Sequence, residues 1–530
     1  MALAKNRPRI PAASASNFPG SRDPGRTAEP SRFGALTPWL AALAIAVAAW
    51  VIRVIGITTI YDLFIDEVTY GQISDNLATG KGVTLYGTPF DLHPPAAFGL
   101  YALAIKLFGI HGSILDVIFA LRPFVALCGA LSCGLVYILI STVVNWQAGA
   151  AVAAVVAIDP FEIFYDDHVM LEAPAQLAAV ASILLLVLSM KAQSSRRSWA
   201  LTVLGGLAAG TSICSKEYFG LVLALVLAIC VVTGWSLKRA KAAAALAIML
   251  ASYVLAQLML MATGGVQAWW NQVGSGTRRL VGAEQITGFN AGTVHVSLLS
   301  RVAANAAHYS VTYLLLATGA IAGLAVLVAT FRRRQQWRAR AGGRNRSAVL
   351  VSTWAFAAAC YLAYATVFGT LEEQMYYLLL MPGICALAVW FWRMGRSWQR
   401  LGTVLLAACL LIDGAVWVSI HGTSDGEYRQ MTAWAEANLP RGSTVSVTDE
   451  TAQFILQGFN LGQWATIPAI KQHHVDYLLL STNLVSQGYG LGSLQFEQYL
   501  DQHAKLVFQA NGPSDGHLQI FDVRMITGVK

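Results

Sequence analysis

The sequence has few charged side chains for its length. Only 12% of its 530 residues are Asp, Glu, Lys or Arg, whereas soluble domains usually have about 25%. Hydrophobic residues make up 56% of the chain, and the mean hydropathy is +0.54. A soluble fold would leave much of this apolar surface in water. The composition therefore excludes a soluble globular protein and indicates a membrane protein.

Two further features are missing. The Pro-, Ser- and Arg-rich residues 1–37 contain no apolar h-region, so they are expected to be a disordered cytoplasmic tail and not a cleaved signal peptide. All cysteines lie within apolar stretches, which argues against a disulfide framework or a cysteine zinc site. The seven are Cys128, Cys133, Cys214, Cys230, Cys360, Cys385 and Cys409.

Apolar stretches that are long enough to cross about 30 Å of hydrocarbon recur along the chain. We count eleven, which predicts a polytopic α-helical membrane domain over residues 38–420 with about 11 transmembrane helices. The chain shows no convincing internal repeat and few charges at midplane depth, although both are typical of transporters. The stretches are residues 38–57, 117–142, 147–164, 171–190, 199–214, 219–235, 242–261, 307–331, 348–368, 376–392 and 401–420.

Basic residues cluster at every second junction between these stretches, except at the uncharged junction near Asn145. Because cytoplasmic loops keep an excess of Lys and Arg, these junctions and the N-terminal tail are assigned to the cytoplasm. Eleven crossings then place residues 421–530 outside the cell. The net charge of +8 is therefore a signal of topology and not of nucleic-acid binding. The Ala-, Val-, Gly- and Arg-rich usage favours a GC-rich bacterium, and hence its plasma (inner) membrane.

The first outer loop, residues 58–116, begins with a helical pattern. Apolar residues at helical spacing from Phe64 to Leu77 predict an amphipathic helix that lies at the membrane interface and does not span it. Asp66 and Glu67 open this helix. They are either a catalytic pair or an N-terminal charge preference, and the two interpretations have equal weight.

A second helical pattern in the same loop follows His93, Pro94 and Pro95 and runs to Phe108. Proline fits the first turn of a helix, so the pattern predicts a second short helix that does not cross the membrane. His93, and Lys81 earlier in the loop, are cationic candidates for binding a donor phosphate or sugar.

The segment DPFEIFYDDHVMLEAP, between the third and fourth predicted spans, is rich in ionisable residues. Such groups are costly at the depth of hydrocarbon unless they face a polar cavity, to which we assign them. His168 and Glu172 are four residues apart and would share one face of a helix. The alternative, a solvated loop with a helix cap, explains Asp159 and Glu162 but not Glu172. The cavity candidates are Asp166, Asp167, His168 and Glu172.

Three other outer junctions add candidates. Lys216 and Glu217 stand between the fifth and sixth spans, where Lys216 is either a snorkelling side chain or a phosphate ligand. The carboxylates before the tenth span are either cavity residues or helix caps. The remaining candidates are the cations Arg278 and Arg279 and the cavity residues Glu217, Glu373 and Tyr376.

After residue 420 short helical and strand patterns alternate. The sequence predicts a helix that ends near residue 439, strands at 444–448 and 475–481, and a helix at 451–456 between them. This indicates a small extracytoplasmic α/β domain over residues 421–530. It has no Gly-rich phosphate loop, which argues against nucleotide binding. Acceptor recognition or shielding of the cavity suits such a domain.

The first outer loop contains FIDEVTY, with Asp66, followed by FDLHPP, with His93. An Asp-Glu pair, an amphipathic helix and His-Pro-Pro at this spacing resemble the protein O-mannosyltransferase and lipid A aminoarabinose transferase group of GT-C glycosyltransferases. The resemblance implies inverting transfer of mannose, arabinose or a similar sugar from a polyprenyl-phosphate donor to an acceptor hydroxyl, with Asp66 as general base. The leaving phosphate needs cationic stabilisation. The candidates, in order of preference, are Lys216, His93, Arg278 and Arg279.

The chain departs from this family pattern around His93. Mannosyltransferases usually continue with Leu-Gly-Lys, whereas this chain has Ala96, Ala97 and Phe98. Aminoarabinose transferases have Lys at the position of His93. The donor sugar therefore stays open, and so does the acceptor, which is a protein, a lipid or a glycan.

Two alternatives to an enzyme fit the same residues. A lipid-linked sugar flippase or solute transporter would use the outer charges to line an entry vestibule, and a scaffold would recruit partners through the C-terminal domain. The scaffold leaves Glu172 and Lys216 unexplained. No cofactor is required by the pattern, but Asp66, His168 and Glu172 would bind a divalent cation if the fold brings them together.

Overall fold

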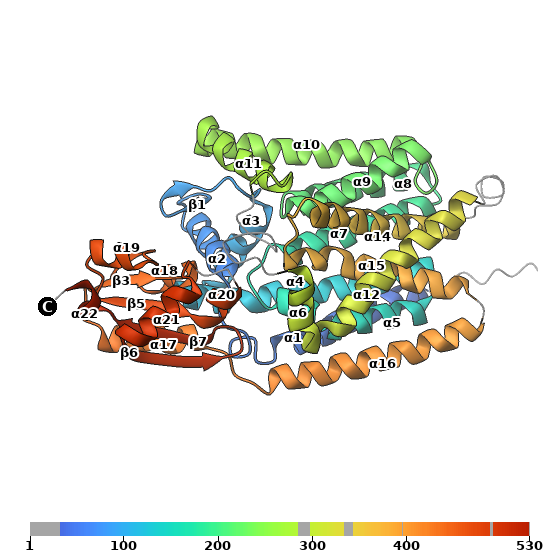
Figure 1. Cartoon of the computed structure of the whole chain (residues 1–530). Coiled ribbons are helices and arrows are strands. Elements are labelled where there is room, and N and C mark those ends of the chain that lie inside the picture. Colours follow the sequence, from blue (N-terminus) through green and yellow to red (C-terminus); the bar gives the residue numbers. More distant parts are fainter. Residues whose placement is uncertain (1–31, 285–296, 333–342, 395, 488–490, 529–530) are drawn as a thin grey trace, which may run out of the picture.

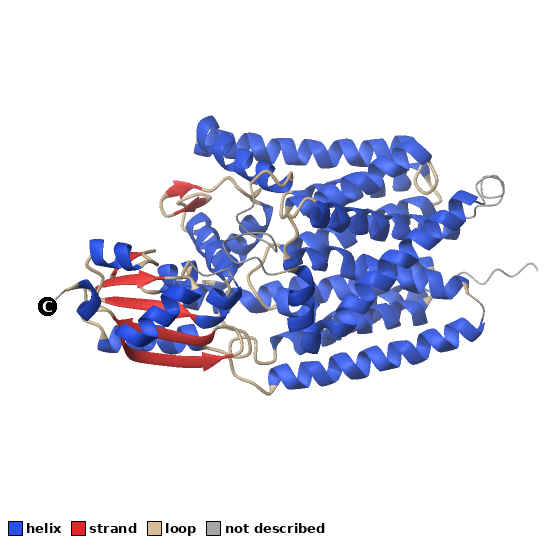
Figure 2. Cartoon of the chain, in the orientation of Figure 1, coloured by secondary structure: helices blue, strands red, loops and turns tan. Residues whose placement is uncertain are grey.

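The computed structural model describes residues 32–284, 297–332, 343–394, 396–487 and 491–528. Most of the expected cytoplasmic tail therefore lies outside the described residues, as does the middle of the basic junction before the ninth predicted span. The chain is mostly helical, with a bundle of long helices and a smaller C-terminal unit that contains a sheet (Figures 1 and 2).

All eleven predicted stretches are helical. Within the described residues eight helices are long and apolar enough to cross a membrane, or nine if the bent pair α5–α6 forms one span. The membrane domain is confirmed, whereas the count of eleven spans stays a prediction. Its helices are α1 (Arg32–Val54), α4 (Ile114–Val143), α5 (Trp146–Ile158), α6 (Pro160–Asp166), α7 (Glu172–Lys191), α8 (Ser195–Ile213), α9 (Glu217–Thr233), α10 (Arg239–Gly264), α12 (Leu298–Arg332), α14 (Gly343–Val367), α15 (Tyr377–Arg393) and α16 (Arg396–His421).

Small residues allow these helices to approach closely. A Cβ atom on Gly319 of α12 would lie 2.6 Å from the Cα atom of Gly383 in α15, so the two backbones touch. At the periphery, α16 exposes most of its apolar surface. Only 6% of the residues in its most apolar stretch are buried. This exposed surface is suited to lipid, and Figure 1 shows α16 along one side of the bundle.

The bend between α5 and α6 positions the second acidic segment. The two helices meet at 63°, and Pro160 occupies the first turn of α6, where its missing N–H costs nothing. The Asp159 carboxylate caps α6 by accepting hydrogen bonds from the backbone N–H groups of Phe161 (2.9 Å) and Glu162 (3.1 Å). The predicted cap is therefore confirmed.

The first outer loop contains the two predicted short helices, α2 (Ile65–Ala78) and α3 (Ala96–Phe108). Between them lies a hairpin of β1 (Thr84–Leu85) and β2 (Thr88–Pro89). Its two turn residues, Tyr86 and Gly87, both have positive φ angles, 51° and 75°. This pair of angles is typical of a two-residue hairpin turn, and it projects the Tyr86 side chain from the loop.

The C-terminal unit is the predicted α/β domain, and the strands and helices predicted at 444–448, 451–456 and 475–481 are confirmed. Its five strands lie in the order β4-β3-β5-β7-β6, with β3 parallel to β4 and β5, and β7 antiparallel to β5 and β6. The elements are α17 (Glu427–Asn438), β3 (Thr444–Val447), α18 (Glu450–Ile455), β4 (Asn460–Gly462), α19 (Ile467–Gln472), β5 (Tyr477–Ser481), α20 (Thr482–Gln487), α21 (Leu494–His503), β6 (Lys505–Gly512), β7 (Gly516–Asp522) and α22 (Arg524–Thr527).

This domain docks on the first outer loop. The backbone N–H of Tyr428 donates to the Asp62 carboxylate (2.8 Å), and Arg429 donates to the carbonyl oxygen of Thr58 (2.7 Å). Figure 1 shows the domain at the same end of the molecule as α2, while α10 and α16 begin at the opposite end. The basic residues at those two helix starts are thus segregated from the loop and the domain.

Candidate active site

Asp66 lies in the first turn of α2 with a half-buried side chain. Within the described ranges no residue hydrogen-bonds to its carboxylate. Burial raises the pKa of Asp66 above its ordinary value, Lys216 and His93 oppose this rise, and Glu172 and Glu372 add to it. Asp66 is therefore open to an incoming group and is more basic than an exposed aspartate.

Glu67 has different surroundings, although it is the next residue. Its buried carboxylate accepts two hydrogen bonds from Arg122 of α4, at 2.5 and 3.1 Å. It also accepts from the backbone N–H groups of Phe64 and Val169, both at 3.1 Å. Burial alone would raise the pKa of Glu67, but Arg122 holds it below its ordinary value. With both oxygens occupied, Glu67 fixes the start of α2 and is not available as a second reactive carboxylate.

Lys216, whose charge acts on Asp66, is buried, with 3% of its surface exposed. Its Nζ atom is 3.3 Å from Oε1 of Glu172 and 3.3 Å from the hydroxyl of Tyr70, and the hydroxyl of Tyr218 donates to the same Glu172 oxygen. The snorkelling interpretation is therefore wrong, because the ammonium group turns into the protein. Lys216 and Glu172 neutralise each other, and the hydrogen bond from Lys216 to Tyr70 connects this ion pair to α2.

The His-Pro-Pro element meets the junction between α8 and α9. Nδ1 of His93 is 3.0 Å from Oε2 of Glu217, and both side chains are partly exposed. The backbone N–H of Ala96 donates to the carbonyl oxygen of Cys214 (2.9 Å), which fixes the start of α3 against the end of α8. His93 and Glu217, which are more than 100 residues apart in the chain, thus lie in one group with Asp66 and Lys216.

The two arginines of α11 (Val266–Leu280) have separate surroundings. Arg279 donates to Glu372 (3.1 Å), whose charge acts on Asp66. Arg278 is 57% exposed and pairs with Glu284 (2.9 Å), close to it in sequence. Arg279 therefore borders the Asp66 group, whereas no contact of Arg278 connects it to that group.

Glu373 and Tyr376 form the short helix η1 (Glu373–Tyr376) that precedes α15. Glu373 accepts a hydrogen bond from Asn305 (2.6 Å), and the ring of Tyr376 packs edge-on against Tyr313, with 5.9 Å between the ring centroids. These predicted cavity residues lie on the α12 side of the bundle, and their hydrogen bonds and ring contacts within the described residues do not include Asp66. The polar contacts of Glu373 are with Asn305 and Tyr313 of α12, so these residues form a polar cluster that is separate from the Asp66 group.

The acidic segment before α7 is buried, and the solvated-loop interpretation is wrong. Asp166 accepts hydrogen bonds from Nε of Arg53 in α1 (2.8 Å) and from the hydroxyl of Tyr377 in α15 (2.6 Å). A Cβ atom on Gly129 would lie 2.1 Å from the carboxyl carbon of Asp166, so only glycine leaves room for this pair. Asp166 thus joins three helices and is not open to a substrate.

His168 and Glu172 do not share a helix face, contrary to the prediction, because residues 167–171 interrupt the helix between α6 and α7. Nδ1 of His168 bonds to the carbonyl oxygen of Phe164 (2.6 Å), and its ring packs between Tyr61 and Phe164. Asp167, at the end of α6, is also buried, and its Oδ1 atom has no hydrogen-bond partner.

The predicted cation ligands Asp66, His168 and Glu172 are not brought together. Glu172 pairs with Lys216, and His168 faces an aromatic cage. Among the described residues the one group of three potential ligands lies elsewhere, at Asp62, Glu427 and Asp515. The surroundings of Asp66 do not fit a divalent cation held by these predicted residues.

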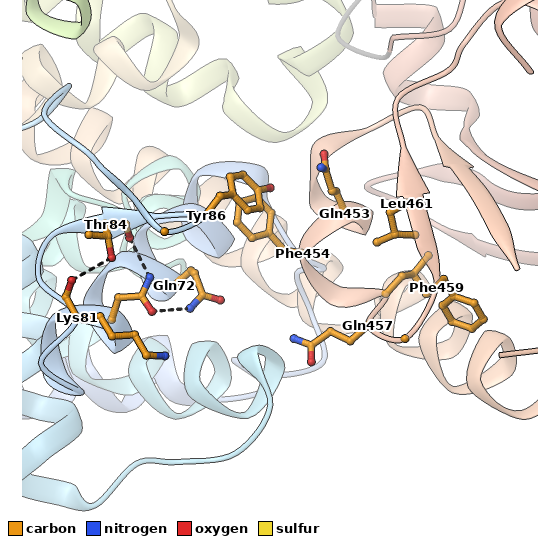
Figure 3. Close-up of a pocket in the computed structure, with 13 residues that line it drawn as sticks. Gln72, Lys81, Thr84, Tyr86, Gln453, Phe454, Gln457, Phe459 and Leu461 are labelled. Atoms are coloured by element: carbon orange, nitrogen blue, oxygen red, sulfur yellow. Dashed lines mark hydrogen bonds between the residues drawn. The ribbon is translucent and has the colours of Figure 1, made fainter. Parts of the chain in front are cut away.

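Lys81 faces a cavity between the first outer loop and the C-terminal domain (Figure 3). The cavity has a volume of about 680 Å³, and amide and aromatic side chains line it from both sides. Tyr86 of the hairpin turn stacks on Phe454 of α18, with 5.0 Å between the ring centroids. Gln72 and Asn76 of α2 line it as well. They lie on a different side of α2 from Asp66, so the cavity is distinct from the Asp66 group.

Sequence reasoning missed Tyr70, Arg53 and Arg122. Tyr70 is four residues after Asp66, so the two share one face of α2. Both arginines lie in or at the end of predicted spans, where a buried cation requires a partner. That rule marks them as unusual, but it does not identify Glu67 and Asp166 as their partners.

Comparisons with known proteins agree with this architecture. Residues 43–270 match the family of dolichyl-phosphate-mannose-protein mannosyltransferases, which is less than half of the chain. The comparison with curated proteins gave no significant match.

Two solved structures share the fold at low sequence identity. The ArnT of Cupriavidus metallidurans, bound to undecaprenyl phosphate, is 15% identical, with a TM-score of 0.55 over 92% of this chain and 98% of that chain. The apo oligosaccharyltransferase of Archaeoglobus fulgidus is 12% identical, with a TM-score of 0.57 over 92% of this chain and 74% of that chain. The chain thus has the fold of GT-C membrane glycosyltransferases, and its residues 43–270 are similar to the mannosyltransferase family.

Proposed function

We propose that the enzyme transfers a sugar from a polyprenyl-phosphate donor to an acceptor hydroxyl on the outer face of the membrane, with Asp66 as the general base. The observation that carries this proposal is the contrast between Asp66 and its neighbours. Glu67, Glu172, Glu217 and Glu372 all have protein partners, whereas within the described residues Asp66 has none.

Inverting transfer requires a carboxylate that takes the proton of the acceptor hydroxyl as its oxygen attacks the anomeric carbon. A base with a raised pKa holds that proton better, and burial gives Asp66 this property. The fixed start of α2 keeps the carboxylate in place during the attack.

The leaving group is a lipid phosphate, and it needs positive charge nearby. We assign this role to His93 and Arg279, which are partly exposed and border the Asp66 group. Lys216 is buried against Glu172, so its proposed role is to hold Asp66 in the charged form. Arg278 and Lys81 lie apart from the group and have no proposed part in binding the phosphate.

The donor class is supported by two similar folds. ArnT was solved with undecaprenyl phosphate, and AglB of Archaeoglobus fulgidus with an inhibitory peptide and a dolichol-phosphate, the latter with a TM-score of 0.55 and 12% identity. We propose the same class of lipid carrier for this enzyme. Mannose and arabinose remain the candidate sugars, and protein, lipid and glycan remain the candidate acceptors.

We further propose three regions: a cytoplasmic tail at residues 1–37, the catalytic membrane domain at 38–420, and an extracytoplasmic domain at 421–530 that recognises the acceptor or shields the site. The location is the plasma membrane of a bacterium. The concentration of basic residues at the end of the bundle away from the domain supports this orientation.

The test uses Asp66→Asn in membranes supplied with radiolabelled polyprenyl-phosphate sugars. We expect a loss of transfer of roughly 10²- to 10⁴-fold, the usual contribution of a general base. Asp75→Asn, on the same helix, is the matched control and should retain activity. Full activity of the Asp66 variant would refute the proposal, and translocation of the lipid-linked sugar without any glycosylated product would support a flippase instead.

A further inference from the structure

Three carboxylates converge where the C-terminal domain meets the first outer loop. They belong to Asp62, just before α2, to Glu427, the first residue of α17, and to Asp515, between β6 and β7. One oxygen of each lies within 4.8 Å of the others. All three residues are buried, with exposed fractions of 3%, 0% and 3%.

Hydrogen bonds satisfy only part of this group. Oδ2 of Asp62 accepts from the N–H of Tyr428 (2.8 Å), and Oε2 of Glu427 accepts from the N–H of Gly426 (3.0 Å). Oε1 of Glu427 accepts no hydrogen bond from the part of the chain that the structure describes, although the residue is wholly buried. An unpartnered carboxylate oxygen inside a protein is costly, which favours a bound cation beside it.

A fourth carboxylate borders the group. Oδ2 of Asp425 accepts from the N–H of Asp62 (3.3 Å) and from the hydroxyl of Ser514 (2.5 Å), while its Oδ1 atom has no partner. A Cβ atom on Gly512 would lie 1.9 Å from Oε1 of Glu427, so a side chain at this position would displace that oxygen. The glycine at position 512 thus leaves room for the Glu427 carboxylate in this group.

No protein cation neutralises these charges. Among the ion pairs of the described residues none includes Asp62, Asp425, Glu427 or Asp515. The nearest arginine in sequence, Arg429, donates to the carbonyl oxygen of Thr58 and lies over the Phe119 ring, 4.3 Å from its centroid. Buried carboxylates are expected to be paired or to coordinate a metal.

We propose that Asp62, Glu427 and Asp515 bind a divalent cation, with Asp425 beside them, and that this cation joins the C-terminal domain to the first outer loop. The group contains only oxygen ligands, which favours a hard cation over zinc. Calcium suits it better than magnesium, because calcium accepts irregular sets of six to eight oxygens while magnesium requires near-ideal octahedra. Backbone carbonyls or water would complete the shell.

The competing explanation is a set of carboxyl groups that share protons. The two explanations differ in their response to calcium and to the loss of one carboxylate. A shared proton gives no calcium dependence, whereas a calcium site makes folding stability depend on the free calcium concentration.

The experiment uses the purified full-length protein in detergent, stripped with EDTA and then titrated with calcium chloride. We expect about one retained calcium ion per chain by elemental analysis. At a calcium concentration of about 100 times Kd the midpoint of thermal unfolding should rise by roughly 2–3 °C. Magnesium chloride and zinc chloride at the same concentration should give smaller shifts.

Two variants on different segments, Glu427→Gln and Asp515→Asn, should each abolish calcium retention and the thermal shift. The matched control is Glu436→Gln, an exposed residue on the same helix as Glu427, which should keep both. In EDTA the Glu427 variant should be at least as stable as the wild type, because one buried negative charge is gone. If one variant fails to fold, the other carries the comparison.

Two results would overturn the site. The first is a wild-type protein that retains no calcium and shows no thermal shift. The second is an equal shift in the wild type and in both variants, since calcium would then bind elsewhere. Neither readout uses sugar transfer, so failure of this proposal is independent of the assigned activity.

Discussion

At the scale of single residues, Asp66 and Glu67 show how neighbours in the chain take different tasks. Asp66 has no hydrogen-bonding partner in the described part of the chain, while Glu67 accepts four hydrogen bonds from Arg122, Phe64 and Val169. A reactive base must be free to meet its substrate, whereas a positioning residue must not move. Their adjacency lets one rigid turn serve both purposes.

Removal of the Glu67 carboxylate should therefore affect folding before chemistry. Glu67→Ala leaves Arg122 buried without its partner, and loss of one member of a buried ion pair costs about 3–5 kcal/mol. Unfolding in detergent should show this loss, while Asp66→Asn should have near wild-type stability. A Glu67 variant that is fully stable but inactive would contradict this view and would indicate that Glu67 takes part in catalysis together with Asp66.

The pH dependence of transfer should report the surroundings of Asp66. A base works when it is deprotonated, so the rate falls as the pH drops through its pKa. Because burial raises the pKa of Asp66, the acid limb of kcat/KM should lie above the ordinary aspartate value of 3.8.

Lys216→Met provides the matching test, because Lys216 opposes the rise in the pKa of Asp66. The acid limb should then move to higher pH, whereas Lys216→Arg keeps the charge and should leave it in place. If the acid limb stays in place in Lys216→Met, Lys216 does not influence the pKa of the catalytic base.

Much of the candidate site followed from local sequence. The short apolar stripe predicted α2, and the structure brings Asp66 close to the predicted candidates His93 and Lys216. The roles of Glu67 and Asp166 were out of reach, because their partners are 55 and 113 residues away in apolar stretches. Local pattern shows that a charge is buried, but the pairing depends on how helices pack.

At the scale of elements, helical periodicity predicted the helices well, while interruptions were harder to see. Residues 167–171 break the helix between α6 and α7, although no proline or glycine occurs among them. Tertiary contacts hold the break in place, such as the hydrogen bond from the backbone N–H of Val169 to the Glu67 carboxylate (3.1 Å). The pairing of His168 with Glu172 failed for this reason.

The crossing of α12 and α15 gives a prediction at this scale. Gly319→Ala would place a Cβ atom 2.6 Å from the backbone of Gly383, so the helices must separate. We expect a loss of stability of about 1–3 kcal/mol, as is usual for an overpacked interior. Gly414→Ala in α16 meets no atom within 4 Å and is the control, and thermal unfolding in detergent measures both.

At the scale of the whole molecule, the first outer loop and the C-terminal domain form one end, and the starts of α10 and α16 lie at the other (Figure 1). The fold class was predictable because hydropathy and charge report membrane insertion directly. How the domain sits on the loop was not, since this depends on single contacts such as Tyr428 with Asp62.

The proposed orientation predicts a labelling pattern in intact cells. A membrane-impermeant maleimide should modify Glu436→Cys, which lies exposed on α17, and should not modify Ser195→Cys, which lies exposed at the start of α8. The wild type should stay unlabelled, because its cysteines are buried or half-buried. Labelling of Ser195→Cys alone would invert the proposed topology.

The two buried ion pairs that contain arginine also constrain the order in which the chain assembles in the membrane. When α4 is synthesised, Glu67 has already been made and is ready to neutralise Arg122. Arg53 of α1, in contrast, must wait for Asp166, which follows 113 residues later. An unpaired arginine costs about 2.5–3.5 kcal/mol at the centre of a span on insertion scales, and less near the end of the span, where Arg53 lies. Biogenesis therefore needs α1 to remain near water, or beside a temporary partner, until α6 arrives.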